Sequence, residues 1–469
     1  MENPKTLFEK LWDKHVVSRF SDGRTLIHID CHFVQEVTSM GAFDSLRKAN
    51  LTVRRPDLTF GVIDHSVSTK PGRTAASYEK TRPRIEAFQK NCRDYGIRFF
   101  DVNDAEQGIV HVVGPEFGIA LPGCTFVCAD SHTSTIGGIG AWAWGIGTTQ
   151  VLQTLVAQML IQRKPKTMKV NFRGKVGAGV FAKDLVLSLI NQHGIGGGFG
   201  YAVEYGGPVV EALPVEGRMT ICNMSIEFGG RSGVVAVDDT TLQYLHNRRF
   251  APKGNAWDRA VAEWRNVKSD DGAQYDKVID IDCSTIKPLV TWGNTPAEVV
   301  AIDEPVPDPS HVDDSERRKM IERALTYMDL KPGKPIEGVP IDVAFIGSCT
   351  NSRLSDLEEA AKVVQGRKVA QGVFALVVPG STQVKKAAEA IGLDKVFKDA
   401  GFEWREAGCS MCLGFNDDSV GPGTRTMSTA NRNFEHRQGR DTRTHIASPA
   451  MVAAAAVAGH ITDVRKFYR

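Results

Sequence analysis

The chain has 469 residues, of which 42% are hydrophobic and 24% are charged, which is ordinary for a water-soluble globular protein. This length exceeds what one hydrophobic core usually serves, so two or three domains are expected. The formal net charge is +2, and no block of like charges is present. Neither feature favours a nucleic-acid-binding protein or a membrane-surface protein.

The cysteine content indicates a reducing compartment. Nine cysteines are scattered along the chain, an odd number, and we see no secretory leader and no Arg-rich presequence. We therefore expect a cytoplasmic protein whose thiols remain available for a metal cluster. The longest apolar run, residues 450–459, is too short to span a membrane and predicts a buried helix.

Two apolar runs in the first third of the chain each end in an acid and a histidine. Asp64 and His65 follow the strand-like run 60–63, and Asp130 and His132 follow the run 126–129. Open α/β sheets place their binding crevices at such strand ends, and a histidine beside an acid can hold a proton to donate. Any single pair of this kind is more often an ordinary surface contact. The two pairs together favour a site, whereas His111 taken alone is more often a core residue.

The middle of the chain carries fewer signals. The Gly-rich runs 137–147 and 194–200 lack a G-x-G-x-x-G context with a downstream acid, so nucleotide binding is not expected. Lys164-Pro165 marks a boundary, and the stretch 303–314 predicts an exposed linker. Glu227, just before Phe228-Gly229-Gly230, is by default a charge at a helix end.

From residue 341 onward, strand-like and helix-like patterns alternate. Strands are predicted at 341–346 and 374–378, and helices at 354–364 and 384–391. This alternation is typical of parallel sheets covered by helices, so the predicted fold class is α/β.

Three cysteines in this part of the chain form the strongest candidate site. Cys349 follows a predicted strand, with Asn351 or Ser352 expected to cap the next helix, and Cys409 and Cys412 are two residues apart. Three thiolates suit an iron–sulfur cluster better than a hard metal ion. They would leave one iron of a four-iron cluster open, as a catalytic metal requires. A zinc knuckle, a redox pair or two buried thiols are the alternatives, and no second C-x-x-C completes a zinc site.

Two arginines lie five residues apart in the polar stretch 431–437. Arg432 and Arg437 could bind carboxylates through paired N–H groups, and a dicarboxylate needs at least two such partners. Arg353 is a third candidate. The alternative is a solvated basic loop, which is the usual fate of Arg-rich segments.

The motifs Gly-Ser-Cys-Thr-Asn-Ser-Arg at 347–353 and Gly-Cys-Ser-Met-Cys at 408–412 resemble those of the aconitase superfamily. Within it the chain is similar to the large subunits of 3-isopropylmalate dehydratases, from residues 6–11 to the Ala-rich segment 450–458. The resemblance implies three α/β/α domains around a central iron–sulfur cleft, without the swivelling fourth domain of aconitases. The expected domains are 1–165, 166–300 and 301–469.

The resemblance also implies the roles of residues. One 4Fe–4S cluster with one iron not ligated by protein is expected on Cys349, Cys409 and Cys412. The reaction implied is the conversion of 2-isopropylmalate to 3-isopropylmalate through isopropylmaleate, in leucine biosynthesis. The implied catalytic residues are Asp64, His65, His111, Asp130, His132 and Glu227, and the implied substrate-binding residues are Arg432, Arg437 and Arg353.

A partner is implied by a missing motif. Aconitases take their catalytic base, a serine, from a Gly-Ser-Ser-Arg segment in the swivelling domain, and this sequence contains no such segment. We therefore expect a small subunit that carries the serine and completes the substrate pocket in a heterodimer or larger assembly.

Several residues depart from the family pattern. His436 stands where glycine is usual, and Phe415 where methionine is common; the others are Gln150, Leu152, Gln153, Ile195, Phe199 and Tyr201. A related hydro-lyase acting on another substituted malate, of the citramalate, homoaconitate or dimethylmalate type, therefore remains an alternative. An iron sensor or RNA-binding protein without the cluster is a lesser alternative, which the small net charge disfavours.

Overall fold

The computed structural model describes residues 3–468, which divide into two compact units. The first unit contains the residues up to Val67, together with Thr74–Gly174 and Gly196–Asp282. The second contains Ser68–Arg73, Lys175–Ile195 and the residues from Cys283 onward. Each unit is built around parallel β-sheets, so the predicted α/β class is confirmed.

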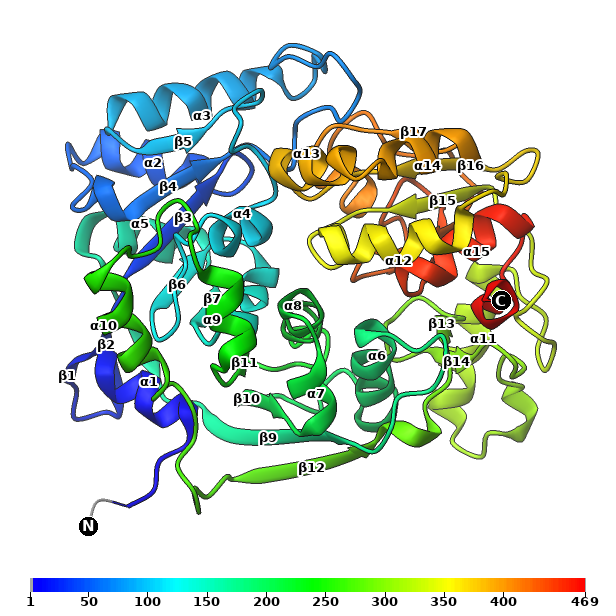
Figure 1. Cartoon of the computed structure of the whole chain (residues 1–469), viewed down its shortest axis with the longest axis horizontal. Helices are drawn as coiled ribbons and strands as arrows, with labels where there is room; N and C mark the ends of the chain where they lie inside the picture. Colours follow the sequence, from blue (N-terminus) through cyan, green and yellow to red (C-terminus); the bar gives the residue numbers. More distant parts are fainter. Residues whose placement is uncertain (1–2, 469) are drawn as a thin grey trace. The chain divides into compact units, whose positions relative to one another are not determined.

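The main sheet of the first unit has five parallel strands in the order β5-β4-β3-β6-β7 (Figure 1). Its strands are β3 (Cys31–Gln35), β4 (Thr59–Val62), β5 (Arg98–Phe100), β6 (Thr125–Cys128) and β7 (Trp142–Gly145). Neighbouring residues such as Phe33 and Val34 belong to different core clusters, because side chains alternate between the faces of a strand. The sheet is therefore buried on both faces, as in a three-layer α/β/α arrangement.

Helices supply the two outer layers of this sheet. One face packs against α1 (Leu7–His15), α2 (Met40–Lys48), α3 (Arg82–Asp94) and α5 (Thr148–Ala157). The other face packs against α4 (Val110–Glu116), the 3₁₀ segment η2 (Ser131–Ile139), α8 (Val215–Asn223) and α9 (Asp239–Leu245). The N-terminal helix begins with a capping box in which Thr6 and Glu9 satisfy each other's backbone N–H groups.

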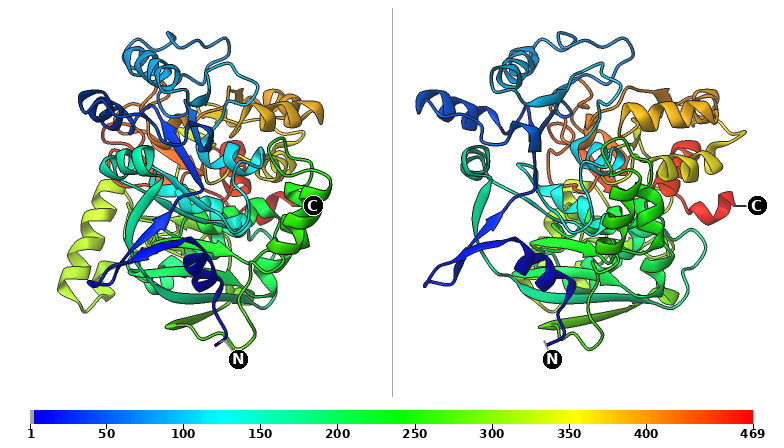
Figure 2. Two further views of the ribbon diagram at one scale, coloured as in Figure 1. Left: turned by 90° about the vertical axis from the view of Figure 1, so that its left-hand side faces the viewer. Right: turned by 60° about the vertical axis from the view of Figure 1, so that its left-hand side comes forward.

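Two further sheets complete the first unit. A parallel sheet has the order β11-β10-β9-β12, formed by β9 (Lys166–Arg173), β10 (Tyr201–Gly206), β11 (Ser232–Val235) and β12 (Lys277–Asp282). An antiparallel sheet contains β1 (Val16–Arg19), β2 (Arg24–His28) and β8 (Met159–Arg163). Figure 2 shows β1 and β2 as a dark blue hairpin. The remaining elements are η1 (Pro56–Leu58), α7 (Pro208–Ala212) and α10 (Asn255–Trp264).

The second unit is organised around a parallel sheet in the order β17-β16-β15-β18-β19. Its strands are β15 (Val343–Ile346), β16 (Phe374–Val377), β17 (Glu403–Trp404), β18 (Arg425–Ser428) and β19 (Arg443–Ile446). Helices α12 (Leu354–Val364) and α15 (Pro449–Ala458) pack together, and α15 contacts β15 and β18. The predicted buried helix at 450–459 is thereby confirmed, with Pro449–Ala456 buried.

The other elements of this unit are shorter or more peripheral. The helices are α6 (Ala182–His193), α11 (Ser315–Met328), α13 (Thr382–Ala390) and α14 (Leu393–Ala400), and the antiparallel pair is β13 (Leu289–Thr291) and β14 (Val299–Ala301). The 3₁₀ segments are η3 (Cys283–Thr285), η4 (Pro309–His311), η5 (Ser410–Cys412) and η6 (Val464–Phe467). Among residues 3–468, no helix has both the length and the apolar character needed to cross a bilayer.

The start of α12 differs from the sequence prediction. The cap predicted for α12 at Asn351 or Ser352 is wrong, because the helix is capped by Arg353, whose backbone N–H donates to Asp356 at 3.0 Å. The division into domains 1–165, 166–300 and 301–469 stays a prediction. Each of those segments contains one of the three parallel sheets, whereas the two compact units form a coarser partition.

Candidate active site

Acidic residues follow three neighbouring strands of the main sheet in the first unit. Glu36 follows β3, Asp64 and His65 lie just after β4, and Asp130 lies just after β6. Because the strands are parallel and adjacent in the order β4-β3-β6, their carboxyl ends meet at one edge of the sheet. The sequence pattern of acids after apolar runs therefore becomes one cluster in space.

A chain of contacts joins the predicted catalytic residues of this cluster. His65 Nδ1 lies 2.6 Å from Asp64 Oδ1, and His65 Nε2 lies 3.3 Å from Asp130 Oδ2. His111, from α4, places Nε2 2.9 Å from Asp130 Oδ1. Asp64 Oδ2 accepts the backbone N–H of Val110 at 3.0 Å, which fixes the start of α4. Carboxylates on both sides of His65 stabilise an imidazolium, so this residue is well placed to hold a proton.

Asp130 carries the negative charge at the centre of this cluster. Burial raises the pKa of Asp130, but the charge of His111 and hydrogen bonds with His111, His132 and His65 outweigh burial and hold the pKa well below its usual range. Asp130 is therefore ionised at neutral pH. It also lines a cavity of about 340 Å³, together with Ser131 and Arg231.

The other two predicted catalytic residues contact each other. The backbone N–H of His132 donates to Asp130 Oδ1 at 2.8 Å, and His132 Nε2 lies 2.9 Å from Glu227 Oε1. Glu227 lies just beyond α8 and is only 6% exposed. It is a buried, paired acid and not the solvated helix-end charge that its local sequence suggests. His111 is likewise buried, as its apolar surroundings predict, but it contacts the acid cluster.

Glu36 is a member of this site that sequence reasoning missed. Its carboxylate accepts the backbone N–H groups of His65 at 2.8 Å, Ser66 at 2.6 Å and Asp64 at 3.4 Å. Burial and the charge of Asp64 raise the pKa of Glu36. The available signal was its position directly after the apolar run 31–35, which matches that of the acids after β4 and β6.

The cysteines predicted to hold the cluster lie in the second unit. Cys349 follows β15, Cys409 directly precedes the turn η5, and Cys412 is the last residue of that turn. All three are at most 6% exposed. Asn431 contacts two of them: its Nδ2 donates to Cys349 Sγ at 3.4 Å, and Cys412 Sγ lies 3.9 Å from its Oδ1. Ser348 Oγ donates to Cys412 Sγ at 3.2 Å.

Two strained residues adjoin these cysteines. Ser348 has a φ of 80° and Ser410 a φ of 52°. A left-handed conformation costs an L-residue roughly 1–2 kcal/mol, and such strain is concentrated at functional sites. Ser410 is held in place by its Oγ, which donates to Asp418 Oδ2 at 2.8 Å.

The donor set fits an iron–sulfur cluster. All nine cysteines of the chain are thiols without disulfides, and polar N–H or O–H donors contact the buried sulfur atoms of Cys349 and Cys412. Such donors stabilise thiolates and tune the potential of a cluster. Cys409 and Cys412 lie on one short turn, and the role of all three cysteines as cluster ligands stays a prediction.

The predicted substrate-binding arginines also lie in the second unit. Arg437 Nη2 lies 3.7 Å from Cys412 Sγ, and its guanidinium stacks on Phe434 at 5.1 Å. Arg353 is 2% exposed, and its Nη1 donates to Thr350 O at 2.9 Å. Within residues 3–468, Arg437 Nε and Arg353 Nε and Nη2 are buried without a hydrogen-bond partner. Arg432 is half-buried in the same loop as Arg437.

Unsatisfied buried donors of this kind are costly, about 1–3 kcal/mol each, and charged donors cost more. The unpartnered N–H groups of Arg437 and Arg353 are therefore available to an anion. The predicted roles of all three arginines stay predictions.

Lys183 is a second residue that sequence reasoning missed. Its Nζ donates to the carbonyl oxygens of Thr429 and Ala430, the latter at 2.9 Å, just before Asn431. Burial lowers the pKa of Lys183 to about 7, against the opposing charge of Asp356. The signal was a charged residue at the start of a largely apolar run, residues 185–190.

The crystal structure of Thermococcus kodakaraensis aconitase X in its holo-form is similar to this chain with a TM-score of 0.48 and 12% sequence identity, over 91% of this chain and 88% of that chain. The family model described as "Aconitase family (aconitate hydratase)" matches residues 9–459. The chain therefore belongs to the aconitase family.

Proposed function

We propose that this chain is the large subunit of a hydro-lyase of the 3-isopropylmalate dehydratase type. It would convert 2-isopropylmalate to 3-isopropylmalate by dehydration to isopropylmaleate and rehydration, in leucine biosynthesis. Family membership indicates a hydro-lyase. The observation that carries the finer assignment is the pair of buried guanidinium groups, Arg437 and Arg353, whose unpartnered N–H groups suit a dicarboxylate.

Cys349, Cys409 and Cys412 would hold one 4Fe–4S cluster. When bound, the cluster supplies a Lewis acid for the hydroxyl and carboxylate of the substrate, which is worth several kcal/mol of transition-state stabilisation. Asn431 and Ser348 would keep the sulfur ligands oriented through the contacts described above. Arg437 would hold a substrate carboxylate, with Arg432 and Arg353 as further partners.

The acid cluster of the first unit would handle protons. His65, between Asp64 and Asp130, can hold a proton and give it to a departing hydroxyl group. Glu227, paired with His132, would orient a water molecule or the hydroxyl. Glu36 would keep the backbone of residues 64–66 in position.

A second polypeptide is part of this proposal. The sequence contains no Gly-Ser-Ser-Arg segment, so we propose that a small subunit brings the catalytic serine and the pocket for the alkyl group of the substrate. The complete enzyme would then be a heterodimer or a larger assembly.

A related hydro-lyase on another substituted malate is the second candidate. Phe415, which departs from the family pattern near Cys412, is 45% exposed, and Phe199 is 82% exposed. Hydrophobic pockets distinguish alkyl groups by only about 1–3 kcal/mol per methylene, so a few such residues could shift the preference.

The test is anaerobic reconstitution of the chain with iron, sulfide and the small subunit from the same genome. We would measure kcat/KM for 2-isopropylmalate, citramalate, 2,3-dimethylmalate, homoaconitate and citrate. A clear preference for 2-isopropylmalate supports the proposal. Preference for another malate keeps the mechanism and changes the substrate, whereas turnover of citrate by this chain alone would refute the two-subunit assignment.

A further inference from the structure

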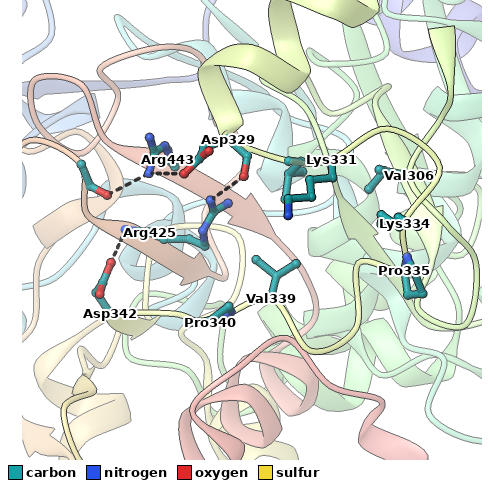
Figure 3. Close-up of a pocket in the computed structure, with 12 residues that line it drawn as sticks. Val306, Asp329, Lys331, Lys334, Pro335, Val339, Pro340, Asp342, Arg425 and Arg443 are labelled. Atoms are coloured by element: carbon teal, nitrogen blue, oxygen red, sulfur yellow. Dashed lines mark hydrogen bonds and ion pairs between the residues drawn. The ribbon is translucent and has the colours of Figure 1, made fainter. Parts of the chain in front are cut away.

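A cavity of about 420 Å³ lies in the second unit, among residues outside the candidate active site (Figure 3). It is bounded by the segment 329–342, which follows α11, and by the first residues of β18 and β19, Arg425 and Arg443. A volume of this size is within the range of small-molecule sites.

Positive charge exceeds negative charge in this cavity. Four basic side chains line it, against two carboxylates, and both carboxylates already have partners. Asp329 Oδ2 lies 3.4 Å from Arg443 Nη1, and Asp342 Oδ2 accepts the backbone N–H of Arg425 at 2.8 Å. The basic residues are Lys331, Lys334, Arg425 and Arg443.

The two lysines supply charge that nothing in the described chain neutralises. Neither the Lys331 nor the Lys334 ammonium group makes a hydrogen bond or ion pair with residues 3–468, and both side chains are exposed. Both ammonium groups can therefore turn towards an anion in the cavity without breaking an existing contact.

Arg425, in contrast, is a fixed cation in the wall. It is 7% exposed, and its Nη2 donates to Met328 O at 2.7 Å while Nη1 donates to His445 Nε2 at 2.9 Å. His445 can accept there because its Nδ1 donates to Thr291 O at 2.6 Å. Burial and the charge of Arg443 lower the pKa of Arg425 to about 10, which leaves it charged at neutral pH.

The remaining wall is apolar. Figure 3 shows Val306, Pro335, Val339 and Pro340 around the same space as the basic side chains. A ligand that fills the cavity therefore needs a small aliphatic part as well as a negative group.

We propose that this cavity binds a small organic anion. Its carboxylate or phosphate group would contact Lys331, Lys334 and Arg443, and its short aliphatic part would pack against Val339 and the two prolines. The assignment does not depend on the reaction proposed above.

Such a ligand would lie close to the loop that carries Arg432 and Arg437, the predicted substrate-binding arginines. Strands β18 and β19 bracket residues 429–442, which include Arg432 and Arg437. At the end of α11, Tyr327 Oη donates to Thr442 O at 2.7 Å and accepts the backbone N–H of His436 at 2.9 Å. Tyr327 thereby ties this loop to the end of α11, next to the segment 329–342 that lines the cavity. We therefore expect a ligand in the cavity to restrain the loop.

The test is calorimetric titration of the full chain with three probes: inorganic phosphate, 4-methylpentanoate and isopentyl phosphate. We expect saturable binding of at least one of the two organic anions, and tighter binding than that of inorganic phosphate. Comparison of the two organic probes decides between a carboxylate and a phosphate group.

The double variant Lys331→Gln, Lys334→Gln should weaken binding of the preferred probe by at least about tenfold, because two charge-assisted contacts are lost. The matched control is Lys319→Gln, Lys362→Gln, which changes two exposed lysines of the same unit outside the cavity and should leave binding unchanged. Hydrogen exchange in residues 429–442 should slow when the probe is bound.

Three results would overturn the proposal. The first is that neither organic anion binds saturably, and the second is that the double variant binds the probe as tightly as the parent does. The third is that Arg437→Gln abolishes binding, because this would place the probe in the candidate active site. Binding of inorganic phosphate as tight as that of isopentyl phosphate would refute the role of the apolar wall.

Discussion

The guanidinium group of Arg437 lies 3.7 Å from Sγ of Cys412. The sequence predicts these residues separately, one as a substrate-binding cation and the other as a cluster ligand. Their contact means that a carboxylate held by Arg437 would lie beside Cys412, which is predicted to be a cluster ligand. The arginine also supports the thiolate by its charge.

Each of the three predicted cluster cysteines should be needed for iron binding. Cys409→Ser and Cys412→Ser should each bind much less iron after anaerobic reconstitution, because a soft thiolate is replaced by a hydroxyl group. The measurement is iron and sulfide content per chain, together with visible absorption. The control is Cys92→Ala, because Cys92 is buried in a hydrophobic core of the first unit. This variant should retain the parent's iron content. Full iron content and turnover in Cys409→Ser would refute its role as a ligand.

Arg437→Lys should lower kcat/KM even though the positive charge is kept. Lysine cannot offer the paired N–H groups, and charge-assisted hydrogen bonds of this kind contribute about 1.5–3 kcal/mol, or roughly 10- to 150-fold. Steady-state kinetics with the small subunit present would measure this loss. Arg440→Lys is the control, since Arg440 is in the same loop but 87% exposed. An equal effect of both substitutions would contradict a specific role for Arg437.

Glu36→Gln should lower catalytic activity without lowering the stability of the protein at pH 7. Burial and Asp64 raise the pKa of Glu36, so its ionised form is disfavoured in the folded state. A raised folded-state pKa gives stability that is lost as pH rises through that pKa. The neutral glutamine, which keeps a carbonyl acceptor, should therefore be at least as stable as the parent at pH 7.

The same substitution should lower kcat by roughly 10- to 100-fold and change the pH profile, because residues 64–66 lose a charged anchor. Urea unfolding and pH–rate profiles provide the two readouts. A variant that is less stable at pH 7 but has an unchanged pH profile would indicate a purely structural role.

His436 is in a left-handed conformation, with a φ of 67°. This is the position where related enzymes usually have glycine, and glycine adopts such angles without the roughly 1–2 kcal/mol that other residues require. His436→Gly should therefore be more stable to urea than His436→Ala by about 1 kcal/mol. Both variants lose the contact in which the Asp441 N–H donates to His436 Nδ1 at 2.9 Å, so the comparison isolates the backbone. A less stable glycine variant would mean that this strain is absent.

Two buried histidines should make the protein sensitive to acid. Burial lowers the pKa of His32 from 6.5 to about 3, and burial with the charge of Arg425 does the same for His445. A lowered folded-state pKa of a base gives stability that is present above pH 6.5 and lost as pH falls towards 3. Each residue should reduce the free energy of unfolding by about 1.4 kcal/mol per pH unit in that window.

His32→Leu provides the test for the first unit. Both ring nitrogens of His32 are buried without a hydrogen-bond partner among residues 3–468, so leucine should fit without loss of a contact. Urea unfolding of parent and variant between pH 7 and pH 4 should give a shallower decline for the variant. Parallel declines would show that His32 does not titrate in this window.

The fold class and the family could be predicted from the sequence because their signals are local. Apolar runs alternate with helical spacing, and the motifs around Cys349 and Cys409 are contiguous along the chain. The same pattern predicts that two strands end near residues 63 and 129, because polar residues appear where a buried strand leaves the sheet.

Tertiary structure alone decided which residues meet. The pairing order β4-β3-β6 brings Glu36 beneath the backbone of residues 64–66, although it lies 28 or more positions away in the sequence. Folding also turns Glu227 from an apparent helix-end charge into the buried partner of His132. Lys183 reaches the carbonyl of Ala430 in the same way, across 247 positions. Contacts of this kind depend on strand order and helix packing, which arise from the burial of the whole core and leave no local pattern in the sequence.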